Sequence, residues 1–124
     1  MQKISTPDAP AAIGPYSQGY IAGDFLFASG QCGFDPATGA TVEGGIAAQA
    51  ERAIQNLGAV LSAGGADFDH VVKTTCFLAD IDDFAAFNAV YEKYFTSSPA
   101  RSCVAVKALP RGVLCEVEAI ACLA

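Results

Sequence analysis

Basic residues are scarce in this sequence, and their scarcity bears on its partners. Seven lysines and arginines stand against 13 aspartates and glutamates, which gives a formal net charge of −6. A nucleic-acid-binding domain normally gathers lysines and arginines on one face. The sequence has no such cluster, so no nucleic-acid partner is expected, and the acidity favours solubility instead.

Histidine is scarcer still, because His70 is the only one. Zinc deaminases use a His-x-Glu motif and a Pro-Cys-x-x-Cys motif, and the sequence contains neither. One histidine and five scattered cysteines do not make a standard catalytic zinc site, so no metal is predicted. A serine or cysteine nucleophile would depend on His70 as its base, and His70 is predicted simply to begin a strand.

The sequence also lacks long apolar runs and Cys-x-x-Cys pairs. No apolar stretch approaches the length of a membrane-spanning helix, and residues 1–5 show no sign of a signal peptide. We therefore expect a cytoplasmic protein with no membrane partner. Its cysteines are then reduced thiols, mostly small buried hydrophobes, and they are Cys32, Cys76, Cys103, Cys115 and Cys122.

Apolar side chains, in contrast, are abundant. They make up 52% of the residues and charged side chains only 16%, which excludes an intrinsically disordered chain. The 124 residues suffice for one domain, 1–124, and no linker or repeat divides them. The apolar surplus is large for so small a domain, which favours burial against a partner subunit.

Alternating apolar residues predict several strands. They are expected at residues 16–22, 25–31, 71–78, 101–108 and 114–123. The Gly-Asp pair at 23–24 suits the turn of a first hairpin, and residues 109–112 are interpreted as the turn of a second hairpin between the last two strands.

Two helices are predicted from apolar residues at three- and four-residue steps. The first runs from Ile46 to Leu61 and is stopped by the glycine pair at 64–65. The second is capped by Asp82 or Asp83, and its apolar stripe consists of Phe84, Phe87, Tyr91 and Phe95.

The predicted second hairpin indicates where a polar site lies. Its last strand alternates between an apolar face and a face that carries Glu116 and Glu118. Matching the apolar faces of the two strands places Arg101 and Cys103 beside these glutamates, on the sheet face that the helices leave open. Such a mixed face suits a subunit interface that contains a small polar site.

Several motifs together resemble one known family. They are Gly-Pro-Tyr-Ser-Gln at 14–18, Ala-Ser-Gly-Gln at 28–31, Pro-Ala-Arg-Ser-Cys-Val at 99–104 and Glu-Val-Glu-Ala at 116–119. Their order and spacing, in a chain of this length, resemble the reactive intermediate deaminase (Rid, or YjgF) family. Residues 49–91 add further matches, so the resemblance covers nearly the whole chain.

The resemblance implies a fold, an assembly and an activity. The fold is α+β and like that of chorismate mutase, with a mixed sheet, two helices on one face and a homotrimeric barrel. The activity is hydrolysis of 2-iminobutanoate, 2-iminopropanoate and related enamines to 2-oxo acids and ammonia. No cofactor is implied, and the sites lie between subunits.

The same resemblance assigns roles to the polar residues of the last two strands. Arg101 matches the arginine that binds the substrate carboxylate, and its planar fork suits that anion. The backbone N–H of Cys103 matches a second carboxylate donor. Glu116 matches the glutamate that holds the attacking water, whereas the hairpin geometry alone places Arg101 nearer Glu118.

The remaining candidates for substrate binding are Tyr16, Ser29, Gly30 and Asn88. The first three match cleft residues of the family, although Tyr16 also suits core packing and Gly30 a close approach of strands. Asn88 either binds backbone or faces the cleft. An alternative function on the same trimer is that of a holdase chaperone or interaction module. Ribonuclease activity is disfavoured by the acidity and the single histidine.

Overall fold

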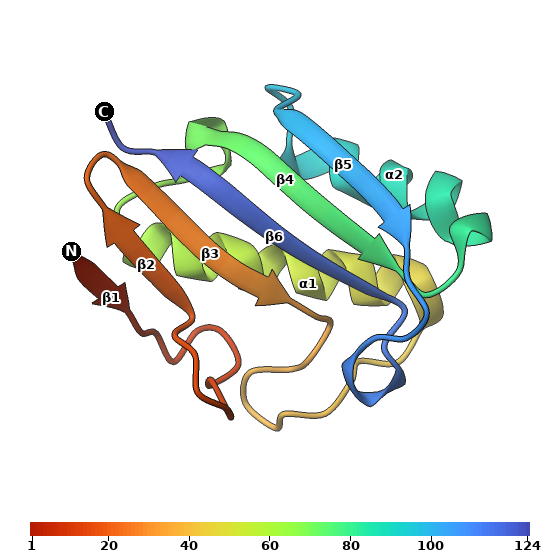
Figure 1. Cartoon of the computed structure of the whole chain (residues 1–124). Coiled ribbons are helices and arrows are strands. Elements are labelled where there is room, and N and C mark those ends of the chain that lie inside the picture. Colours follow the sequence, from red (N-terminus) through yellow and green to blue (C-terminus); the bar gives the residue numbers. More distant parts are fainter.

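Six strands form one mixed sheet in the computed structural model, which describes residues 1–124 (Figure 1). In chain order they are β1 (Gln2–Ile4), β2 (Gly19–Ala22), β3 (Phe25–Gln31), β4 (Val71–Leu78), β5 (Ala100–Ala105) and β6 (Cys115–Cys122). Their order across the sheet is β1-β2-β3-β6-β4-β5. Only β4 and β5 are parallel, and every other neighbouring pair is antiparallel.

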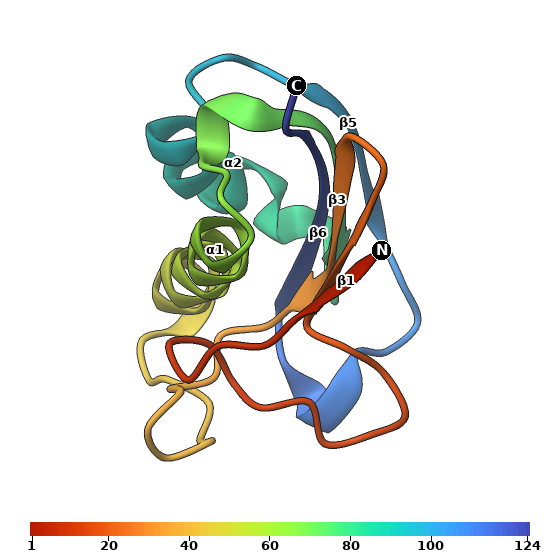
Figure 2. The same cartoon turned by 90° about the vertical axis from the view of Figure 1, so that its left-hand side faces the viewer.

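Two helices, α1 (Gly45–Ala63) and α2 (Phe84–Tyr94), cover one face of this sheet (Figure 2). Three short 3₁₀ turns complete the structure, η1 (Phe68–His70), η2 (Ile81–Asp83) and η3 (Pro110–Gly112). The α+β prediction of a mixed sheet with two helices on one face is confirmed.

The core lies between α1 and the central strands. The helical repeat buries Ala53, Leu57 and Val60 of α1. They pack against the alternate residues Val117 and Ala121 of β6, which are also buried. The residues that alternate with them in β6, which include Glu116 and Glu118, therefore point to the sheet face that the helices leave open.

The ends of the predicted elements are close to those observed. The β2–β3 turn contains Gly23 at φ 60°, a conformation that favours glycine, and α1 ends against Gly64 as expected. Asp83, one of the two predicted caps, occupies the N-cap position of α2. Asp83 precedes the helix but its side chain makes no capping bond, whereas the Asp80 carboxylate accepts a 2.9 Å bond from the Asp82 N–H in η2.

The predicted second hairpin is also wrong, because β4 lies between β5 and β6 (Figure 1). Strands β4 and β5 are joined through α2, and a helical crossover places two strands parallel and adjacent. Residues 106–114 then carry the chain past β4 through η3, where Arg111 adopts a positive φ of 56°.

This arrangement reverses the predicted face of β5. In the sheet register Arg101 of β5 pairs with Thr74 of β4, which pairs in turn with Ala119 of β6. Cys103 pairs in the same way with Cys76, and Cys76 with Val117. The four partners are buried on the helix-covered face. Arg101 and Cys103 therefore lie on that face, while Glu116 and Glu118 lie on the open one.

Candidate active site

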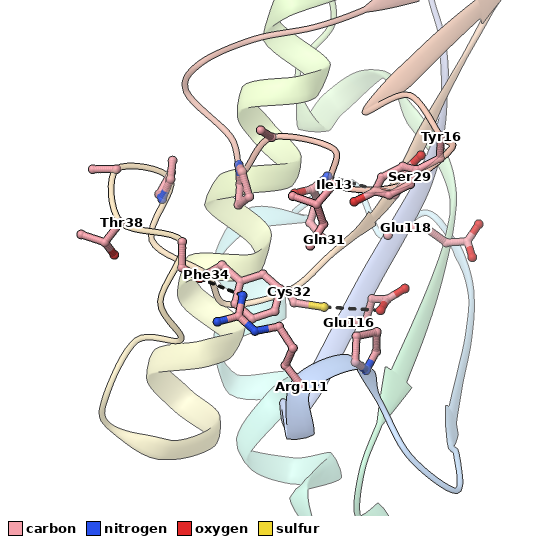
Figure 3. Close-up of a pocket in the computed structure, with 17 residues that line it drawn as sticks. Ile13, Tyr16, Ser29, Gln31, Cys32, Phe34, Thr38, Arg111, Glu116 and Glu118 are labelled. Atoms are coloured by element: carbon pink, nitrogen blue, oxygen red, sulfur yellow. Dashed lines mark hydrogen bonds between the residues drawn. The ribbon is translucent and has the colours of Figure 1, made fainter.

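A cavity of about 780 Å³ opens where the N-terminal arm, the end of β3 and the start of β6 meet (Figure 3). Four of the predicted site residues line it, namely Tyr16, Ser29, Gly30 and Glu116. Glu118 lines it as well. Both glutamates project from the open face of the sheet, because alternate side chains of β6 point to the same face. Two carboxylates therefore line one cavity.

Glu116 is held more firmly than Glu118. The thiol of Cys32 donates a hydrogen bond of 3.3 Å to Glu116 Oε1, whereas Glu118 is exposed and has no side-chain partner in the chain. The two ion pairs of the chain join Lys93 to Glu51 and His70 to Asp67, so no cation neutralises Glu116. Glu116 is therefore an oriented carboxylate without an ion-pair partner in the chain.

Gly30 makes room for this carboxylate. The pairing of β3 with β6 shifts between Ala28 and Gln31, and Gly30 lies in this irregular stretch. A Cβ atom at Gly30 would come within 2.1 Å of Glu116 Oε2, which no side chain tolerates without movement. The glycine thus allows the β3 backbone to approach the Glu116 side chain closely.

Hydrogen bonds of Gln18 and Ser29 hold the N-terminal arm in place at the wall of the cavity. The buried Gln18 amide donates to the carbonyl oxygens of Thr6 and Pro10 at 3.1 and 2.8 Å and accepts from the Thr6 N–H at 2.7 Å. Ser29 Oγ donates to the Ser17 carbonyl at 2.6 Å. These bonds hold the arm against the sheet and leave Tyr16, 52% exposed, at the cavity edge.

Arg101 and Asn88 of α2 form a second polar cluster, on the face of the sheet that the helices cover. Arg101 Nη1 donates a 2.7 Å hydrogen bond to Asn88 Oδ1. The guanidinium carbon lies 4.7 Å from the centre of the Tyr91 ring and 5.5 Å from that of Phe84. No carboxylate pairs with Arg101, so its remaining N–H groups are free to bind an anion.

The Tyr91 ring packs against the guanidinium group of Arg101. Its hydroxyl shares a buried 2.7 Å hydrogen bond with Thr74 Oγ1, and burial raises the pKa of the Tyr91 phenol. The ring is thus a fixed, neutral surface for the guanidinium. Cys103 follows Arg101 on the same face, and burial likewise raises the pKa of its thiol.

The structure therefore divides the predicted site into two groups. One contains Glu116 with Tyr16, Ser29 and Gly30, and the other contains Arg101 with Asn88 and Cys103. Two strand spacings and opposite sheet faces separate Arg101 from Glu116 within one chain. The prediction that both lie together on one face of a single sheet was wrong.

Cys32 and Arg111 are among the cavity residues that sequence reasoning missed. Cys32 directly follows the Ala-Ser-Gly-Gln motif, and that position was its only sequence signal. Arg111 reaches the cavity from η3, stacks 4.5 Å from the Phe34 ring centre and donates to the Gly39 carbonyl at 2.9 Å. It ties the 35–39 loop to the turn before β6.

No three histidine, cysteine, aspartate or glutamate side chains gather so that they could hold a metal ion. Neither helix has the length and apolar character needed to cross a membrane.

Comparison with known proteins identifies the family of this chain. The family model described as Endoribonuclease L-PSP matches residues 6–123. The chain belongs to this family. A family relative from Capra hircus, named 2-iminobutanoate/2-iminopropanoate deaminase, is 54% identical over 95% of this chain and 87% of its own length.

Solved structures of the Endoribonuclease L-PSP family have the same fold. Escherichia coli TdcF with bound serine superposes with a TM-score of 0.94 at 40% identity, covering 98% of both chains. RidA from the Antarctic bacterium Psychrobacter also gives 0.94, at 42% identity over 98% of this chain and 99% of its own. The resemblance to the Rid family read from the sequence motifs is thereby confirmed.

Proposed function

We propose that this protein is a 2-iminobutanoate/2-iminopropanoate deaminase that converts reactive imino acids to 2-oxo acids and ammonia. The observation that carries the proposal is the 54% identity, over 95% of the chain, to a protein named for that activity. In the reaction, water adds to the imine carbon, and the C–N bond breaks to release ammonia and leave a carbonyl group.

Glu116 is the group that orients and deprotonates the water. It faces the cavity, accepts a hydrogen bond from Cys32, and forms no ion pair within the chain that would weaken it as a base. General-base assistance of this kind contributes about two to four powers of ten in rate. Tyr16, Ser29 and Gly30 line the same cavity and shape the space around the imine.

Arg101 is the group that binds the substrate carboxylate. Asn88 fixes one arm of the guanidinium and Tyr91 supports its plane, so the fork is preorganised for two parallel hydrogen bonds. The backbone N–H of Cys103, on an edge strand, supplies a further donor.

Because the two groups lie on opposite faces of the sheet, one complete site needs two subunits. We propose a homotrimer in which Arg101 of one subunit meets Glu116 of the next. The open face supports this assembly, since Phe25, Phe27 and Val104 are 44–46% exposed on it. Apolar groups of that size on one face favour an interface. The free cysteines support a reducing, cytoplasmic setting.

The family description also raises RNA cleavage, and the charge of this chain disfavours it. The net charge is −6, and the cavity that holds Glu116 also contains Glu118. Two carboxylates repel a phosphodiester, whereas a small imino acid needs only one cation for its carboxylate.

The test generates 2-iminobutanoate in solution and follows its disappearance with and without the protein. We expect rapid loss of the imine with wild-type protein and only the spontaneous rate with Arg101→Ala, although that variant remains folded by circular dichroism. A wild-type preparation that leaves the spontaneous rate unchanged would reject the deaminase activity.

A further inference from the structure

The carboxylate of Glu116 has neighbours on both of its oxygens, and both come from the end of β3. Oε2 lies against the backbone of Gly30, and Oε1 accepts the hydrogen bond from the Cys32 thiol. No other side chain of the chain donates to Glu116. The thiol is therefore the single directional contact that this chain supplies to fix the rotation of the carboxylate (Figure 3).

The backbone that carries Cys32 is anchored to α1. The buried Asn56 amide donates to the carbonyl oxygens of Cys32 and Phe34 at 3.0 and 2.9 Å. The next residue, Gly33, approaches the α1 backbone so closely that a Cβ there would lie 2.8 Å from Gln49 Cα. The thiol thus projects from a rigid segment and holds one position relative to β6.

The chemistry of a thiol suits this place. Burial and the neighbouring Glu116 raise the pKa of the Cys32 thiol far above its ordinary value, so it stays protonated and remains a donor. A thiol is also a weak donor, unlike an ammonium or guanidinium group. It orients the carboxylate without neutralising its charge, which an effective base needs.

We propose that Cys32 is a positioning residue for the deamination reaction, holding Glu116 in the orientation in which its carboxylate faces the cavity. This role rests on the proposed function, since Glu116 is the base there. In this role Cys32 acts on the reaction through the Oε1 atom of Glu116.

The test compares two substitutions of Cys32. Cys32→Val fills a similar volume but removes the donor, and Cys32→Ser restores a donor in a smaller side chain. With 2-iminobutanoate we expect Cys32→Val to lower kcat by about three- to tenfold, with KM unchanged, because Arg101 still binds the carboxylate. Cys32→Ser should recover most of that loss.

A matched control is Cys122→Val, since Cys122 lies at the far end of β6 from Glu116. This variant should behave as the wild type. Unchanged kcat in Cys32→Val, or an equal loss in Cys32→Ser, would overturn the positioning role and leave Cys32 as packing.

Crystal structures of wild type and Cys32→Val give a readout that does not depend on activity. We expect one Glu116 rotamer in the wild type and a rotated or divided carboxylate in the variant. The same single rotamer in both would reject the inference even if the deaminase activity stands. If the wild type is inactive, the proposed function fails, and the rotamer comparison still decides whether Cys32 orients Glu116.

Discussion

The side-chain contacts of Arg101 are with neutral groups. It is partly buried, its hydrogen-bond partner is the neutral amide of Asn88, and its plane rests on Tyr91. An ion-pairing role would need a carboxylate, and the chain provides none beside it. At the scale of one residue, these contacts favour an anion-binding role.

The first prediction concerns Arg101→Lys. Lysine keeps the charge but loses the planar fork and the stacking on Tyr91. Loss of one hydrogen bond to a charged group costs about 1.5–3 kcal/mol, so kcat/KM for 2-iminobutanoate should fall by about ten- to a hundredfold. Turnover close to that of the wild type would mean that Arg101 contributes only its charge.

The second prediction separates Glu116 from Glu118, which share one face of β6 and one cavity. Glutamine preserves shape but is a far poorer base. Glu116→Gln should lower kcat by about two powers of ten or more, while 2-oxobutanoate still binds through Arg101. Glu118→Gln serves as the matched control and should have a mild effect. If steady-state kinetics give the reverse order, Glu118 holds the water.

At the scale of elements, the sequence predicted what depends on neighbouring residues. The alternation in β4 and β6 and the helical spacing in α1 are local patterns, and these elements were found close to the predicted bounds. Strand pairing depends on the whole chain. The α2 crossover makes β5 the parallel neighbour of β4, and nothing within residues 100–123 records that.

The same limit applies to the site residues. Motifs brought Tyr16, Ser29, Gly30 and Glu116 forward as candidates, and the structure gathers these four around one cavity. The motifs did not show on which face of the sheet Arg101 lies. On the edge strand β5 the apolar residues Val104 and Ala105 lie on opposite faces, so the sequence of this strand does not mark one face as buried. Cys32 carried no pattern of its own.

The third prediction concerns α1, whose buried face carries most of the contact with the sheet. Leu57 is fully buried in the core, so Leu57→Ala should cost about 2–5 kcal/mol of unfolding free energy through lost burial and a residual cavity. Ser62→Ala on the exposed side of α1 is the control and should change little. Urea denaturation measures both, and equal midpoints would contradict the assigned core.

At the scale of the whole molecule, the fourth prediction is the assembly. Burial of Phe25, Phe27 and Val104 should hold three copies together, with a mass about three times that of one 12.7 kDa chain. Light scattering at micromolar concentration measures it. A stable, fully active monomer would contradict both the trimer and the shared site.

The placement of Arg101 and Glu116 on opposite sheet faces has a genetic consequence. In the proposed trimer, the variants Arg101→Ala and Glu116→Gln should each disable a different half of every site. When their subunits mix at random in equal amounts, about one site in four receives an intact half from each neighbour. Two dead proteins, co-expressed or refolded together, should therefore regain about a quarter of the wild-type activity. Such complementation would also protect a cell that carries both alleles.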